Sequence, residues 1–568
     1  MKAFTHLLSI LILEVIMLSP SFGNGVKSTL DPALNGFWEG QLPLGKEYIL
    51  VLYINSEKAD VHNFIQLFKS GVRQSNDQID SIELVDGFYS FKIKSVNGLY
   101  KFKRNEDTLK GIIFFPNGNQ AKVRFVKVDK PSIGDFSNIK SPPKINLLTY
   151  KYENDKILED YDFFIKSIKE NQPNLYTFSN KKDFEALISA TRKKLNRKFT
   201  QMEFLRIITV LAERIGCGHL GVGPSAEISQ YIDRVRFVPF FIKIIEGKVY
   251  IGENYIDKLK DKSGVELLSI NGRNIDDILA EIINGLPVDG RNLSSKIAVI
   301  EQNFPILYIN HIEAADHYKI EYKSPQTGES GTIELEGLKF GHFPKEYYAN
   351  HPDKIPNSFP VTLKLKDKKI AIIKVTQFYY KDFDIFYHSI DSMFNKIRKR
   401  KINNLIIDLR GNSGGDPRLS FYLLTKIALD DFIYFKSPEE LKKVYPALFS
   451  KRTVDSKHFK GRVFVLMDGA CKSTAAHFLS IVKFHYWAKL VGRETGATFY
   501  CNAGTKDLIL PNTKIKLVQP TIEVITNVNE WDKLSPLKPD YQVKYTYEDL
   551  LKNSDPDLEF TFKLINNN

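Results

Sequence analysis

The strongest constraint on the fold is a repeated order of short apolar runs and amphipathic stretches in the C-terminal third of the chain. Residues 370–375 read IAIIKV, and residues 405–409 form a second apolar run of similar length. Between them, residues 383–397 place apolar side chains at helical spacing. A strand, a helix and a strand of these lengths predict a βαβ unit, which joins parallel strands.

The pattern then continues with a further strand, helix and strand. Residues 463–467 are apolar, residues 474–485 have helical spacing, and residues 490–491 begin another apolar run. The segment from 358 to 565 is therefore expected to be an α/β core. In such sheets, functional residues gather at the carboxyl ends of the strands.

Two turns follow these carboxyl ends. The first reads DLRGNSGG over residues 408–415, and its glycines let backbone N–H groups approach a substrate, as an oxyanion hole requires. The GxxxxGK[ST] spacing of a nucleotide-binding loop is absent from it. The second turn reads MDGACKSTAAHF over residues 467–478 and places Ser473 at a predicted helix start, where free N–H groups stabilise an anion. Taken alone, such a serine is most often only a helix cap.

The beginning of the chain resembles a secretory signal peptide. Lys2 precedes an apolar stretch over residues 7–18, and Ser21 and Gly23 are small residues at the two positions that a signal peptidase reads. The stretch is shorter than the ~20 apolar residues of a membrane span, and no cysteine follows the predicted cleavage site. We therefore expect a leader at 1–23 and a secreted or periplasmic protein without a membrane span.

The rest of the 568-residue chain divides into several predicted domains. Residues 24–130 alternate apolar and polar side chains between Asn-Gly and Asp-Gly turns, which predicts an all-β barrel or sandwich with a lipocalin-like opening. Residues 131–147 contain three prolines and are expected to be a linker. Residues 148–235 are expected to be helical, with Thr200 and Glu203 as a capping box at one helix start and Gly216 placed to end that helix. Residues 236–345 are expected to be β-rich and PDZ-like, with a peptide added to a sheet edge.

Charge and cysteine content argue against several classes of function. The formal net charge is +13, but the lysines are spread along the chain, so we expect a solvated basic surface and no nucleic-acid partner. Three cysteines are too few for a disulfide scaffold, and their spacing matches no zinc site. We expect no metal and no cofactor.

Together, the two turns are similar to those of the tail-specific (C-terminal processing) serine peptidases, in particular tricorn-like and secreted bacterial members with a His base. The resemblance extends over residues 148–565 and includes KPDYQV at 538–543. It implies a ClpP/crotonase-like core, an endopeptidase acting on polypeptides, and Ser473 as the nucleophile. It also implies an oxyanion hole formed by Gly414 or Gly415 with the backbone at Thr474.

The same resemblance offers two kinds of general base. Members with a Lys base carry it at the position that Thr498 occupies here, so a Ser–Lys pair is not expected. Members with a His base carry it in a loop that matches GCGHL at residues 216–220, with a cysteine in place of the usual Asp. This match makes His219 the expected base. His477, one helical turn after Ser473, is a rival base on the same face.

The third residue of the triad is less defined by the resemblance. Glu494 is the first choice, and Glu530 and Asp532 are alternatives. If Ser473 and His219 touch, Cys471 and Cys217 must be near neighbours, and we hypothesise a disulfide between them, with two free buried thiols as the alternative.

Two other functions remain open from the sequence. The chain is compatible with a catalytically inactive peptide-binding protein on the same fold. A lipocalin-like ligand carrier requires the N-terminal β module to enclose a cavity.

Overall fold

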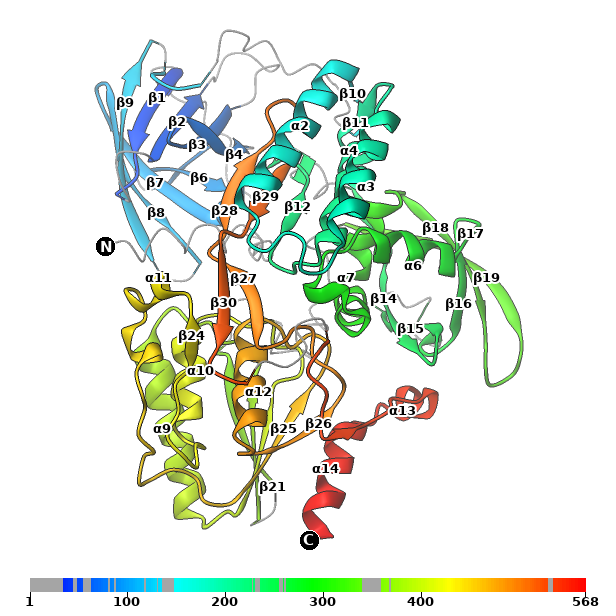
Figure 1. Cartoon of the computed structure of the whole chain (residues 1–568). Helices are drawn as coiled ribbons and strands as arrows, with labels where there is room; N and C mark the ends of the chain where they lie inside the picture. The colour runs from blue at the N-terminus through cyan, green and yellow to red at the C-terminus, as the bar shows by residue number, and fades with distance from the viewer. Residues whose placement is uncertain are drawn as a thin grey trace. The chain divides into compact units, whose positions relative to one another are not determined.

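The computed structural model describes most of the chain in two compact units (Figure 1). One unit comprises residues 1–150 with 225–233, and the other comprises 151–224 with 234–568. The predicted leader at 1–23 and most of the predicted linker lie outside the described residues. The described residues are 34–43, 48–54, 63–79, 82–85, 88–116, 119–129, 131–134, 148–226, 228–229, 235–254, 259, 262–339, 359–366, 369–529 and 535–567.

The first unit is a single antiparallel sheet in the order β4-β3-β2-β1-β9-β8-β7-β6-β5. Asp77 on β4 accepts hydrogen bonds from the N–H and hydroxyl of Ser95, at 2.5 and 2.6 Å, which ties β4 to the segment after β6. The elements are β1 (Gly36–Gln41), β2 (Tyr48–Ile54), β3 (Asn63–Lys69), β4 (Val72–Ile79), β5 (Glu83–Val85), β6 (Phe88–Ile93), η2 (Lys94–Val96), β7 (Gly98–Asn105), β8 (Thr108–Phe114) and β9 (Gln120–Val128).

Aromatic side chains form much of the apolar core of this unit. Trp38, Tyr100 and Phe102 are fully buried there, and the Trp38 indole donates a hydrogen bond to the carbonyl of Leu34 at 2.8 Å. A ligand carrier needs an enclosed cavity, so this aromatic packing gives the ligand-carrier alternative no support.

The second unit opens with the expected helical segment. Thr200 and Glu203 form the predicted capping box at the start of α4, and Gly216 ends this helix with φ of 69°. The elements are β10 (Lys151–Tyr152), α2 (Asn154–Asn171), α3 (Lys181–Lys194), β11 (Phe199–Thr200), α4 (Gln201–Ile215) and β12 (Gly221–Gly223).

A β-rich part with its own apolar core follows. Its main sheet has the order β14-β15-β16-β18-β19, and β17 returns onto β16 through a turn at Asn271 and Gly272, both with positive φ. The elements are β13 (Arg236–Phe237), β14 (Phe240–Ile245), β15 (Lys248–Asn254), β16 (Glu266–Ile270), β17 (Arg273–Asn274), α6 (Ile275–Asn284), η4 (Asp289–Arg291), α7 (Leu293–His311), β18 (His317–Lys323), β19 (Ser330–Glu336) and β20 (Leu338–Lys339).

The α/β core is built on one six-stranded sheet in the order β21-β22-β23-β25-β26-β31. Every neighbouring pair from β22 to β31 is parallel, and only β21 runs antiparallel. The elements are β21 (Val361–Lys366), β22 (Ile370–Val375), α9 (Phe383–Lys399), β23 (Asn404–Asp408), α10 (Pro417–Leu424), β25 (Arg462–Met467), α12 (Thr474–Phe484), β26 (Lys489–Gly492), β31 (Tyr541–Gln542) and α14 (Pro556–Asn566). The predicted strands and helices of this region are confirmed to within two residues at each end.

Successive residues of the central strands enter two different apolar clusters. On β23, Ile407 joins the cluster that contains α9, α10 and α12, whereas Ile406 joins the cluster that contains Ile565 of α14. Burial on both faces explains why these strands are apolar without interruption. Smaller elements complete the unit: β24 (Phe435–Ser437), α11 (Glu439–Lys442), η6 (Pro446–Phe449), β27 (Tyr500–Ala503), β28 (Lys506–Ile509), β29 (Lys516–Gln519), β30 (Ile522–Thr526) and α13 (Tyr547–Lys552).

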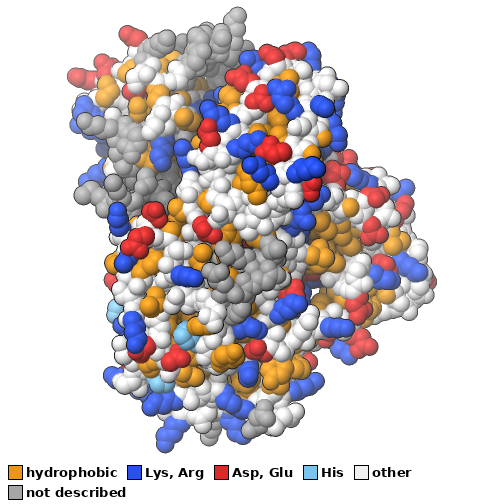
Figure 2. Space-filling view, in the orientation of Figure 1, with side chains coloured by type: hydrophobic (Ala, Val, Ile, Leu, Met, Phe, Trp, Pro, Cys, Tyr) orange, Lys and Arg blue, Asp and Glu red, His pale blue; other side chains and the backbone are white. Residues whose placement is uncertain are grey.

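The surface view in Figure 2 shows basic side chains interspersed with acidic ones on the face that it draws. Within the described part of the chain, no helix combines the length and apolarity needed to cross a bilayer.

A buried ion pair joins the helical segment to the β-rich part. Lys296 on α7 donates to Glu213 on α4 at 2.6 Å, and the two side chains are 5% and 6% exposed. Lys296→Met should lower the free energy of unfolding by about 3–5 kcal/mol, because it removes the close partner of a buried carboxylate and leaves it only the half-exposed Arg214, 3.6 Å away. Urea denaturation of Lys169→Met is the control, because Lys169 pairs with Glu185 at the surface and should cost at most about 1 kcal/mol. Equal losses in the two variants would contradict the prediction.

Candidate active site

Ser473 lies in the turn between β25 and α12, with a backbone that is unusual for a residue with a side chain. Its φ and ψ are 51° and −129°, and its hydroxyl makes no capping hydrogen bond to α12. The explanation of Ser473 as a simple helix cap is therefore wrong. Conformations of this kind cost about 1–3 kcal/mol and cluster at functional sites.

The Ser473 hydroxyl instead faces His219. The distance from Ser473 Oγ to His219 Nε2 is 3.2 Å, across 254 residues of sequence. His219 reaches this position because Gly216 ends α4 in a left-handed conformation and β12 then pairs with β29. The structure thus brings together the two residues that the sequence selected as nucleophile and base.

The rival base does not contact the serine hydroxyl. The His477 ring is buried, with its Nε2 3.3 Å from Cys501 Sγ, and it packs edge-on against Tyr434 and Phe435. Burial, with a smaller repulsion from His219, lowers the pKa of His477 to about 3. His477 is thus a neutral core residue.

Two charged side chains act on the imidazole of His219. Burial lowers the pKa of His219, the carboxylate of Asp289 raises it, and the ammonium of Lys472 lowers it again. The net direction is downward, so His219 is neutral and able to accept a proton near neutral pH.

The two turns predicted to meet are in close contact. A Cβ placed on Gly414 would lie 2.7 Å from Ser473 Cβ and 3.0 Å from Thr474 N, and the φ of Gly414 is +109°. Only glycine allows this approach. The hydroxyl of Thr474 donates to the carbonyl of Gly415 at 2.6 Å, which joins the turns directly.

The N–H groups of the glycine loop have different roles. Gly414 N–H donates to the side chain of buried Asn412 at 2.8 Å, so it is already used inside the loop. Asn412 in turn donates to the carbonyl of Val375 at 3.0 Å. Gly415 N–H makes no such hydrogen bond to any described residue.

Charged side chains hold the glycine loop from behind. Arg410 donates to both carboxylate oxygens of Asp408, at 2.9 and 2.8 Å, and to both oxygens of Asp555, at 2.6 and 2.8 Å. The N–H of Gly411 is shared between the two oxygens of Asp468, which belongs to the serine turn. Burial acts against the charge on Arg410, but its carboxylate partners outweigh it and raise its pKa.

The first choice for the third residue does not reach the base. Glu494 offers only its backbone carbonyl, which accepts from the Ser294 hydroxyl at 3.2 Å, and within the described residues its carboxylate makes no hydrogen bond to His219. Glu530 and Asp532 lie outside the described residues. The acid that does lie beside the His219 loop is Asp289, which the sequence did not single out.

The disulfide hypothesis is not supported, because all three cysteines are free and buried. Cys471 Sγ contacts the carbonyl of Leu409 at 3.1 Å, whereas Cys217 Sγ contacts the amide of Asn502 at 3.7 Å. Burial raises the pKa of the Cys217 thiol to about 12, which keeps it neutral. Among the residues described, no group of three or more His, Cys, Asp or Glu side chains is arranged to hold a metal ion.

The family comparison decides the identity of the core. Residues 369–543 match the family model described as peptidase family S41. The α/β core belongs to peptidase family S41. This match contains Ser473 and both turns, and it establishes the chain as a homologue of S41 serine peptidases. The tail-specific peptidase resemblance is thereby confirmed.

Solved structures show the same fold at low identity. Mature CPAF has a TM-score of 0.53 at 12% identity, covering 70% of this chain and 94% of that chain. Mature CPAF complexed with lactacystin has a TM-score of 0.54 at 12% identity, covering 73% of this chain and 99% of that chain. The photosystem II D1 C-terminal processing protease gives only 0.37 at 11% identity, covering 70% of this chain and 94% of that chain. No curated protein matches the sequence.

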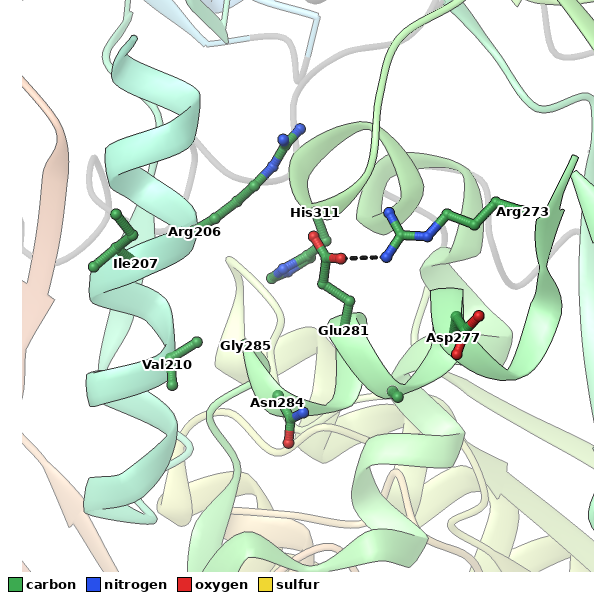
Figure 3. Close-up of a pocket in the computed structure, with 10 residues that line it drawn as sticks. Arg206, Ile207, Val210, Arg273, Asp277, Glu281, Asn284, Gly285 and His311 are labelled. Atoms are coloured by element: carbon green, nitrogen blue, oxygen red, sulfur yellow. Dashed lines mark hydrogen bonds and ion pairs between the residues drawn. The ribbon is translucent and has the colours of Figure 1, made fainter. Parts of the chain in front are cut away.

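A surface pocket of about 570 Å³ lies between α4 and α6 (Figure 3). Arg273 donates to the carboxylate of Glu281 there, and Arg206 and His311 also line the pocket. The lining includes neither Ser473 nor His219, so this pocket is separate from the contact between those two residues.

The bond between the two turns gives a first prediction for the S41 site. Thr474→Val keeps the side-chain shape but removes the donor to Gly415, which should slow fluorophosphonate labelling of Ser473 by about tenfold. Thr474→Ser keeps the hydroxyl and should label at nearly the wild-type rate. Labelling rates of the two variants, measured beside their melting temperatures, test this; equal rates would refute it.

The charge of Lys472 gives a second prediction. Lys472→Met removes a cation that lowers the pKa of His219, so that pKa should rise. Because the base must be unprotonated, the acid limb of the labelling-rate profile should then move to higher pH. Lys489→Met is the control, since Lys489 is exposed on β26. If the acid limb of the profile stays in place or moves to lower pH in Lys472→Met, Lys472 does not lower the pKa of His219.

Proposed function

We propose that the chain is a serine endopeptidase that hydrolyses polypeptides through an acyl-enzyme. The 3.2 Å contact between Ser473 Oγ and His219 Nε2 carries the proposal. A serine hydroxyl needs such a base, because it scarcely ionises near neutral pH.

The reaction proceeds in two steps. Ser473 Oγ attacks a peptide carbonyl while His219 Nε2 takes the hydroxyl proton, and the tetrahedral intermediate collapses as His219 returns this proton to the leaving amine. Water then attacks the ester, with His219 again accepting and returning a proton, and releases the acid and free Ser473.

We assign the stabilisation of the oxyanion in each tetrahedral intermediate to hydrogen bonds from the backbone N–H groups of Gly415 and Thr474. Thr474 begins α12, where the positive end of the helix favours an anion. The hydroxyl bond from Thr474 to Gly415 supports the pairing. Gly414 serves instead to let the loop approach Ser473.

The β-rich part at residues 236–345 is proposed to be a PDZ-like domain that captures the substrate. A six-stranded antiparallel sheet with α6 and α7 supports this proposal, because an edge strand can pair with an extended peptide. We further propose export with cleavage after Gly23. N-terminal sequencing of the exported protein should then begin at Asn24.

Fluorophosphonate labelling tests the catalytic assignment. Wild-type protein should be labelled, Ser473→Ala should not, and His219→Ala should label at least about 10³-fold more slowly. His477→Ala should label at a rate close to wild type, because its ring does not contact Ser473.

The serine that is labelled should also be the one that cleaves an unfolded polypeptide. Ser473→Ala should therefore abolish both labelling and cleavage. Loss of labelling in His477→Ala with retention in His219→Ala would reverse the choice of base. Folded wild-type protein that is never labelled would identify the chain as a non-catalytic peptide-binding protein.

A further inference from the structure

A short segment between α6 and α7 contacts the loop that carries His219. This segment, η4, begins at Asp289, whose Oδ1 accepts the N–H of Gly218 at 2.7 Å. The N–H of Gly290 donates to the carbonyl of Gly216 at 2.9 Å. Two hydrogen bonds therefore hold η4 against the residues that immediately precede the base.

The approach leaves little room for a side chain at Gly218 in the His219 loop. A Cβ on Gly218 would lie 3.2 Å from the backbone nitrogen of Asp289 and 3.3 Å from its carboxylate. The carboxylate of Asp289 is thus packed directly on the residue before His219.

Each of the two side chains has one buried polar atom left unpaired. Asp289 Oδ2 and His219 Nδ1 are both inaccessible to solvent and have no hydrogen-bond partner among the described residues. A carboxylate oxygen can only accept, and an unpaired buried acceptor is costly. A protonated Nδ1 is the complementary donor.

The protonation that the reaction requires at His219 is compatible with Asp289 Oδ2 as the acceptor for Nδ1, although the two atoms are not hydrogen-bonded to each other in the structure. Nε2 faces the Ser473 hydroxyl and must be unprotonated to take its proton. In a neutral imidazole the proton then lies on Nδ1, which needs an acceptor.

The charge of Asp289 also acts on the groups around the base. Burial lowers the pKa of His219 and of Lys472, and the charge of Asp289 opposes that lowering. Burial raises the pKa of Cys217 and Cys501, and Asp289 adds to that rise. The other charge acting on His219 is that of Lys472. Among the residues that the structure describes, Asp289 is the carboxylate whose charge acts on His219.

We propose that Asp289 is the positioning residue for His219. Its carboxylate holds the imidazole with Nδ1 protonated and Nε2 toward Ser473, and it stabilises the imidazolium formed when Ser473 attacks. This inference rests on the proposed function and takes the role expected for Glu494.

The variant Asp289→Asn tests the proposal with little change of shape. Its amide oxygen can still accept from Gly218 N–H. Its NH₂ group is a donor where the proposal requires an acceptor for Nδ1, which favours the wrong tautomer. The labelling rate of Ser473 and the kcat for an unfolded polypeptide should fall about 10²–10⁴-fold. The KM and the melting temperature should stay close to wild type, and Asp289→Glu should recover part of the loss.

A second readout measures the imidazole itself. The pKa of His219, followed by NMR of histidine-labelled protein and identified with His219→Gln, should be lower in Asp289→Asn than in wild type. The acid limb of the labelling profile should move to lower pH by the same amount. Asp277→Asn, which removes an exposed carboxylate on α6, should change none of these values.

The outcomes separate this inference from the proposed function. Labelling within about threefold of wild type, with an unchanged His219 pKa, would overturn the role of Asp289. A larger loss in Glu494→Gln, Glu530→Gln or Asp532→Asn than in Asp289→Asn would overturn it as well. If wild-type protein is neither labelled nor active, the proposed function fails, and the His219 pKa still decides whether Asp289 pairs with the base.

Discussion

The hydrogen bond from Thr474 to the carbonyl of Gly415 joins the two turns on which the rest of the site depends. Both turns follow parallel strands, so they leave the sheet at the same edge and lie side by side. Contact then requires a residue without a side chain at 414, because a Cβ there would collide with Ser473. Asp468 adds a second link between the turns by accepting the N–H of Gly411.

The base is supplied from outside this sheet, and its placement depends on different forces. α4 packs with the β-rich part through the buried pair of Lys296 and Glu213, and its last turn ends at Gly216. Residues beyond this helix end are then held by η4 and by the pairing of β12 with β29. The 3.2 Å contact at Ser473 is thus the meeting point of two separately supported loops.

Much of the fold was predictable from local patterns. Uninterrupted apolar runs indicated the parallel strands because both faces of the sheet are covered, and the capping box and Gly216 marked the ends of α4. Ser473 and His219 were found because each lies in a recognisable turn. The positive φ of Ser473, by contrast, is indicated by neither the composition nor the periodicity of the sequence.

Asp289 was not predictable in the same way. It lies 71 residues from Gly218, in a Val-Asp-Gly-Arg segment that indicates only a turn. Its significance depends on how the β-rich part packs against α4, which is a tertiary property. The enclosure of His477 was not predictable for a similar reason. Helical spacing put this rival base on the face of Ser473 without showing that aromatic rings and Cys501 enclose it.

The Arg410 network also has a consequence for the order of assembly. The Asp555 carboxylate that binds Arg410 lies 145 residues further along the chain than the loop it supports. A ribosome therefore releases the glycine loop well before its supporting carboxylate exists. During synthesis, Arg410 therefore lacks its partners Asp555 and Asp557 until that later segment has emerged, and of its carboxylate partners only Asp408 is present from the start.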